Sequence, residues 1–178
     1  MDWKKNWTLI VGVAAMALLV WGTFAEGGSL TQKVLFVIGA PVLGVTAFFN
    51  KQKMFTVLQL VASVGAVLGF FTETPSLVRY SIMLGVAVIS FGYLLKAKYY
   101  STDKWGIIGT IGLICFACAF ATDAAAEALI FNSLMITGGV LVAFYSSTSF
   151  FIQKVRIAAI WVILNLLLII NPLVFILS

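Results

Sequence analysis

Four amide side chains stand inside long apolar stretches of the sequence, and these are the residues best suited to bind a ligand. They are Gln59, Asn132, Asn165 and Asn171. Each amide offers two donors and an acceptor, and a polar side chain is costly in apolar surroundings unless something pairs with it. Asn165 lies closest to the middle of its stretch, so we expect it to face inward.

Three aromatic residues away from the stretch ends are the natural companions of these amides: Trp21, Tyr93 and Trp161. Trp161 precedes Asn165 by four positions and therefore shares a helix face with it. Together the rings and amides predict a cavity for a small polar or ring-shaped solute. The alternative is that the amides only hydrogen-bond neighbouring helices.

A proline interrupts the second apolar stretch. Pro41 stands between Gly39 and Gly44, and the backbone hydrogen bond that it removes permits a kink. This pattern predicts a hinge, although proline is also simply tolerated in membrane helices.

Other reactive residues form no catalytic or metal-binding pattern. The chain has no histidine, which removes the commonest general base and metal ligand. Cys115 and Cys118 form a CxxC pair with apolar neighbours, which favours packing over redox chemistry. The hydroxyl run 146–149 either binds an anion or hydrogen-bonds its own helix. We expect no enzyme activity, metal or cofactor.

The composition defines the elements that position these residues. Of 178 residues, 62% are hydrophobic and 10% charged, with a mean hydropathy of +1.13. Apolar residues on all faces of a helix indicate lipid as the solvent. The sequence therefore predicts an all-α, polytopic membrane helix bundle, one domain over residues 1–178. The seven predicted transmembrane helices are 7–24, 34–49, 54–71, 77–95, 105–121, 129–149 and 155–176.

The basic residues predict an orientation. With seven spans and the N-terminus inside, nine of the 11 Lys and Arg residues fall on the inner side, and only Lys33 and Arg79 fall on the outer side. The positive-inside rule thus favours a cytoplasmic N-terminus and an extracytoplasmic C-terminus. The basic excess is explained by the anionic inner leaflet and not by nucleic acid.

An internal repeat is indicated at an offset of 98 positions, which aligns Trp7 with Trp105, Ile38 with Ile136 and Val42 with Val140. It predicts a 3+1+3 pseudo-repeat of 1–72 and 99–178 around a linker helix at 77–95. Parallel repeats of this kind occur in transporters, whereas apolar stretches also match by chance.

This layout resembles that of the SWEET sugar transporters and the PnuC-type nicotinamide riboside transporters, both of the PQ-loop superfamily. The stretch 44–51 and the run Val155-Arg156-Ile157 with Trp161 and Asn165 resemble the YgjV-type inner-membrane family. The chain lacks a Pro-Gln pair, and its predicted orientation is opposite to that of SWEETs. The resemblance implies a fold and an inner-membrane location and names no substrate.

Two functions from different classes follow. The first is a small-solute transporter or facilitator with a polar-lined central cavity. The second is a non-catalytic subunit or assembly factor of a larger membrane complex, with other membrane subunits or a second copy as partners besides the lipid bilayer. A polar pocket near the middle of the bilayer favours the first, and a long apolar face matched to a partner favours the second.

The orientation is tested by a reporter fused after Ser178. Because nine basic residues fall on the predicted inner side, we expect the fusion to be active as an extracytoplasmic reporter. A cytoplasmic signal there would mean that the number of spans is wrong by an odd number.

Overall fold

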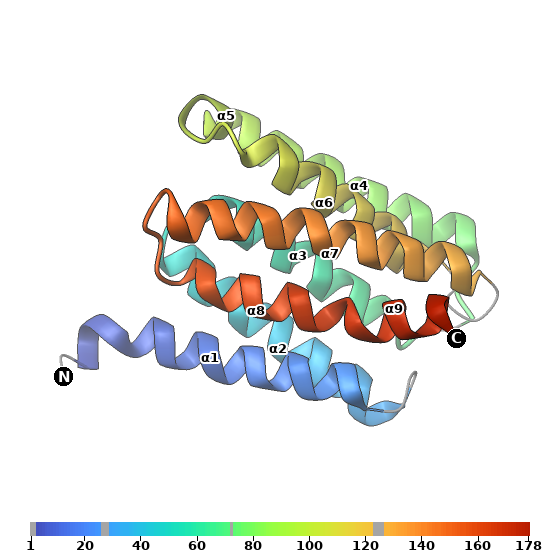
Figure 1. The fold of residues 1–178 in the computed structure, drawn as a ribbon. Helices are drawn as coiled ribbons and strands as arrows, with labels where there is room; N and C mark the ends of the chain where they lie inside the picture. Colours follow the sequence, from blue (N-terminus) through green and yellow to red (C-terminus); the bar gives the residue numbers. More distant parts are fainter. Residues whose placement is uncertain (1–2, 26–28, 72, 123–126) are drawn as a thin grey trace.

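The computed structural model describes residues 3–25, 29–71, 73–122 and 127–178. Within these ranges the chain folds into helices joined by short turns (Figure 1). The helices are α1 (Trp3–Phe24), α2 (Leu30–Phe49), α3 (Lys53–Leu68), α4 (Ser76–Lys96), α5 (Tyr99–Thr102), α6 (Gly106–Ala121), α7 (Ala128–Phe151), α8 (Ala158–Leu168) and α9 (Ile170–Leu177).

The helices have the length and composition of membrane-spanning elements. Among the described residues, five segments of 18 or more residues are apolar enough to cross a membrane, counting α8 and α9 together as one. The helices α3 and α6 are also apolar but have 16 residues each. Large apolar side chains are exposed along the outer faces, such as Leu77, Leu84 and Ile89 of α4. The expected all-helical fold is therefore confirmed for the described residues, and its long apolar helices are compatible with a membrane bundle.

Six helices form a closed ring. Around it, α1 packs on α2, α2 on α3, α3 on α6, α6 on α7, α7 on α8, and α8 returns to α1. The remaining long helix, α4, lies outside the ring against α3 and α6. A closed ring of helices leaves an interior that side chains from every member can reach.

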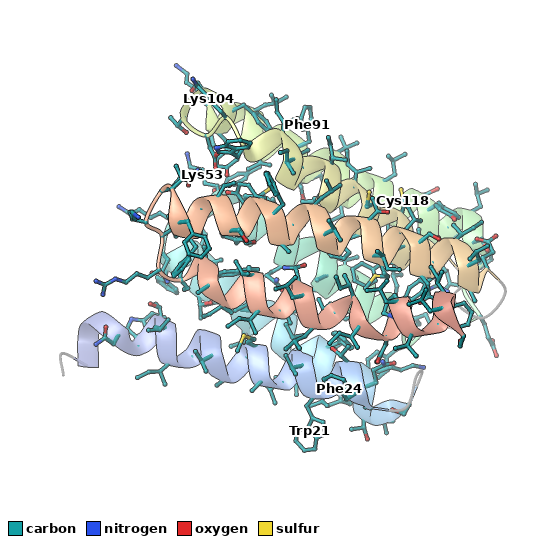
Figure 2. The ribbon with its side chains drawn as sticks, in the orientation of Figure 1. Trp21, Phe24, Lys53, Phe91, Lys104 and Cys118 are labelled. Atoms are coloured by element: carbon teal, nitrogen blue, oxygen red, sulfur yellow. The ribbon has the colours of Figure 1, made fainter. Side chains whose placement is uncertain are left out.

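The basic residues gather at one end of this ring. That end, here called the basic end, holds the start of α1 and the turns α2–α3, α4–α6 and α7–α8, with nine of the 11 Lys and Arg residues. Lys53 and Lys104 mark it in Figure 2. The opposite end, here called the far end, holds the C-terminus (Figure 1) and the other two basic residues, Lys33 and Arg79.

Two details differ from the sequence prediction. The last predicted span, 155–176, is divided at Ile169 into α8 and α9. Pro172 explains the division, because its ring collides with the carbonyl four residues earlier, at Leu168. The expected loop 96–104 contains the short helix α5, which begins after Lys98 in a left-handed conformation, with φ of 50°.

Small residues allow a close approach of α6 and α7. A Cβ atom added to Gly112 would lie 2.7 Å from Val142 Cγ2 and 3.2 Å from the Gly138 carbonyl oxygen. In a bilayer, helices associate through close packing of this kind because lipid tails are as apolar as leucine. Gly85, on the outer helix α4, would place a Cβ with nothing within 4 Å.

Two alanine substitutions test this difference in packing between Gly112 and Gly85. Gly112→Ala should lower the thermal midpoint of the detergent-solubilised protein, because overpacking costs about 1–3 kcal/mol. Gly85→Ala should leave the midpoint unchanged or raise it slightly, since alanine is the better helix former. Equal midpoints for the two variants would contradict the close α6–α7 packing.

Candidate functional site

A cavity of about 520 Å³ lies inside the helix ring. It is lined from α1, α2, α3, α6, α7, α8 and α9, with one side chain from α4. Its volume falls within the ~300–1,000 Å³ of typical ligand pockets. The chain thus encloses a hollow large enough for a small organic molecule.

The cavity extends to the far end of the bundle. Its lining there includes Thr23 at the end of α1, Lys33 in the first turn of α2, Gly69 just after α3, Arg79 in the first turn of α4, and Thr122 just after α6. Because all of these helix ends lie at the far end, the hollow reaches that end.

Toward the basic end the ring is packed. The lining residues nearest the basic end include Leu58 and Gln59 of α3, Val142 of α7 and Trp161 of α8. Beyond them the side chains of Thr46, Met54, Phe55, Tyr145 and Ala158 are all buried. The hollow therefore ends inside the bundle instead of passing through it.

An aromatic stack forms the floor of the cavity. Phe55 and Trp161 lie nearly parallel, with ring centroids 4.3 Å apart, and Phe55 also packs on Tyr145 at 5.3 Å. Trp161 is 0% exposed. The stack joins α3 to α8 across the ring and seals it on the basic side.

Two amides of the sequence prediction lie next to this floor. Gln59 is 6% exposed and Asn165 is 4% exposed, and both line the cavity. Asn165 Nδ2 donates to the Trp161 carbonyl at 2.7 Å. Since that bond lies within α8, it does not join Asn165 to another helix.

Several polar atoms of the lining have no hydrogen-bond partner. Within the described residues these are Gln59 Oε1, Trp161 Nε1 and Arg79 Nε, all buried. An unsatisfied buried donor or acceptor costs about 1–3 kcal/mol, and such atoms are rare in native proteins. All three belong to residues that line the hollow.

The other two amides lie nearer the far end. Asn132 lines the cavity, and its Nδ2 donates to the Ala128 carbonyl at 2.8 Å, within α7. Asn171 also lines the cavity, and its Nδ2 donates to the Thr23 carbonyl. The second bond joins α9 to α1, so Asn171 has the interhelical role that the alternative reading expected of these amides.

The predicted partners Trp21 and Tyr93 lie outside the cavity. Trp21 is 64% exposed and points away from the bundle (Figure 2). Tyr93 is 43% exposed and lines a surface hollow beside Lys51 and Lys53 at the basic end. Their amphipathic rings suit the outer surface of a membrane helix, so the expectation that they converge on the amides does not hold.

Pro41 also lies apart from the cavity. It is exposed within α2, which continues as a helix from Leu30 to Phe49. The hydroxyls of Ser146, Ser147 and Thr148 donate to carbonyls of their own helix at 2.6–2.8 Å. This favours the local interpretation of that run over anion binding.

The sequence analysis did not identify one buried carboxylate, that of Asp103. Asp103 is buried at the basic end and accepts from Tyr99 Oη at 2.5 Å, Tyr145 Oη at 3.1 Å and the Trp105 backbone N–H at 3.0 Å. Burial raises the pKa of Tyr99 above its ordinary value, so this phenol is protonated and can donate. Asp103 stands in a predicted loop, and no spacing in the sequence signals its two tyrosine partners.

Comparison of the chain with models of known protein families, with curated proteins and with solved structures finds no match.

Proposed function

We propose that the chain is a seven-span membrane protein that carries a small solute through its central cavity. The observation that carries this proposal is the hollow, open toward the far end, with the buried and unpartnered polar atoms of Gln59 and Trp161 beside its floor. A carrier needs a polar-lined pocket inside the bundle. The packed floor and the reach toward the far end fit the state of a carrier that is closed on one side.

The seven-span arrangement has support from the helix directions. The short helices α3 and α6 belong to the ring and run antiparallel to their neighbours in sequence. At 1.5 Å per residue each is about 24 Å long, which is short of a ~30 Å hydrocarbon layer but compatible with local thinning. With nine basic residues at one end, the positive-inside rule makes the basic end cytoplasmic.

The 3+1+3 repeat has support from the ring order. If α1, α2 and α3 correspond to α6, α7 and α8, the packing of α3 on α6 corresponds to that of α8 on α1. The helix α4, outside the ring, then takes the place of the linker. This arrangement agrees with the resemblance to 3+1+3 transporters.

A similar pair of residues stands on α3 and on α8, although the two pairs lie 106 positions apart and so outside the 98-position register of the repeat. On α3 an aromatic residue, Phe55, precedes the amide Gln59 by four positions. On α8 the aromatic Trp161 precedes the amide Asn165 by four. The two rings stack on each other, and both amides line the cavity. Two aromatic–amide turns, on α3 and on α8, therefore lie at the floor of one hollow.

The competing function, a structural subunit, makes a different demand on Asn165. It requires this amide to bond another helix or a partner chain, whereas the one hydrogen bond seen for its side chain in the described residues runs within α8. The exposed apolar faces are accounted for by lipid. The carrier is therefore the better supported of the two functions.

The distinction is tested with two matched variants, Asn165→Leu and Asn171→Leu. Asn171→Leu removes a bond between α9 and α1 and should lower the stability by about 0.6–2 kcal/mol. Asn165→Leu removes only a bond within one helix and should leave the thermal midpoint in detergent unchanged or higher. A loss of stability for Asn165→Leu equal to that of Asn171→Leu would favour the structural subunit instead.

A further inference from the structure

The two basic residues of the far end both line the cavity. Nine of the 11 Lys and Arg residues lie at the basic end, so Lys33 and Arg79 are the exceptions. They come from different helices, α2 and α4, and Arg79 is the one lining residue that α4 supplies. The only Lys and Arg residues of the far end therefore both line the hollow, one from α2 and one from α4.

No acidic side chain lines the cavity among the described residues; Glu26 and Asp123 lie outside them. Arg79 Nη2 donates to the Phe120 carbonyl at 3.4 Å, a long bond, and its Nε has no partner. Lys33 Nζ lies 5.9 Å from the centre of the Phe70 ring. Among the described residues, the cavity thus carries positive charge without a lining carboxylate beside it.

The deep end of the cavity has different hydrogen-bonding groups. Trp161 Nε1 is a donor and Gln59 Oε1 is an acceptor, and both are buried without a partner in the described part of the chain. A hydroxyl or amide group can accept from the first and donate to the second. Between the two ends the walls are largely aromatic and aliphatic, with Phe36, Phe116 and Phe131 among them.

We infer that the solute is an organic anion with a hydrogen-bonding group at its other end. A carboxylate or phosphate lies toward Lys33 and Arg79, an apolar body lies against the aromatic walls, and a hydroxyl or amide reaches Gln59 and Trp161. Trp161 and Asn171 both line the cavity and stand ten positions apart. Ten residues extend about 15 Å along a helix, which sets the approximate length of the solute. This inference rests on the proposed carrier function and narrows its substrate class.

The test compares three probes of one skeleton on the purified full chain: hydroxyphenylpropionate, its primary amide, and hydroxyphenylpropylamine. They share the ring and the hydroxyl and carry a negative, a neutral and a positive end. Affinities are measured from ligand-induced shifts of the thermal midpoint in a neutral detergent. We expect the anion to bind about tenfold more tightly than the amide, as one charge-assisted hydrogen bond gives, and its advantage to shrink at high salt.

Three variants assign the charge effect to the cavity. Lys33→Gln and Arg79→Gln should each weaken binding of the anion and leave the affinity for the amide unchanged. Lys53→Gln removes a basic residue that lies outside this cavity, at the other end, and should change neither affinity. Arg79→Lys keeps the charge and serves where Arg79→Gln does not fold.

An anionic lipid headgroup has the same chemistry as a free anion, and nanodiscs separate the two sources. Hydroxyphenylpropionate binding is measured in phosphatidylcholine alone and in phosphatidylcholine mixed with phosphatidylglycerol. Competition by the anionic lipid, lost in Lys33→Gln, identifies a headgroup as an occupant, and unchanged binding identifies a free solute. Both outcomes support an anionic ligand.

Two results would overturn the inference, and they differ in what else they remove. Tighter binding of the amide or the amine than of the anion would refute the charge assignment while leaving a solute-binding cavity. Binding of none of the three probes in detergent or nanodiscs would contradict the proposed carrier function as well.

Discussion

The stack of Phe55 on Trp161 is the contact on which the rest of the site depends. It joins α3 to α8 with ring centroids 4.3 Å apart, and Tyr145 of α7 extends it from the other side of Phe55. Tyr145 in turn donates to Asp103, which the Trp105 backbone holds at the start of α6. A continuous line of packed and hydrogen-bonded side chains therefore closes the ring at the basic end. Because this end is packed, the residues above the stack line a hollow that extends toward the far end.

The ring around that hollow follows from how helices pack in lipid. Apolar side chains on the outer faces gain nothing by facing another helix instead of lipid, so close backbone approach decides the neighbours. Gly112 and Gly138 provide it between α6 and α7, and Gly39 provides it between α2 and α1, where an added Cβ would lie 2.8 Å from Leu19 Cγ. Where large side chains such as Phe116 and Phe131 point inward, the helices cannot collapse onto the axis, and space remains. Packing and cavity are thus two results of one distribution of small and large residues.

The sequence predicted the helices well because apolar stretches and basic turns are local signals. It also placed Trp161 and Asn165 on one face, since four-residue spacing is a property of any helix, and both line the cavity. The sequence prediction failed where the direction of a side chain depends on the neighbouring helices. Trp21 and Tyr93 have apolar sequence neighbours, as Trp161 does, but their side chains face outward. Asp103 does lie in a loop, as predicted, between α5 and α6. Its burial by Tyr99 and Tyr145 was missed, because Tyr145 lies 42 positions beyond Asp103 and leaves no local trace. The positive charge at the far end of the cavity was visible in the sequence only as Lys33 and Arg79, the two exceptions to the positive-inside count.

We expect water and solute to reach the ring interior from the far end alone, and cysteine labelling measures this directly. In a background with Cys115 and Cys118 replaced by alanine, single cysteines are introduced at Ala66, which lines the cavity, at Val57, which is buried near the basic end, and at Ala14, which is exposed on the outside of α1. The protein is embedded in a bilayer and treated with a small charged thiol reagent that cannot cross it. The account predicts rapid labelling of Ala66→Cys from the far-end side and almost none of Val57→Cys or Ala14→Cys. Labelling of Ala66→Cys no faster than of Ala14→Cys would show that the hollow does not admit solutes, and would contradict the account.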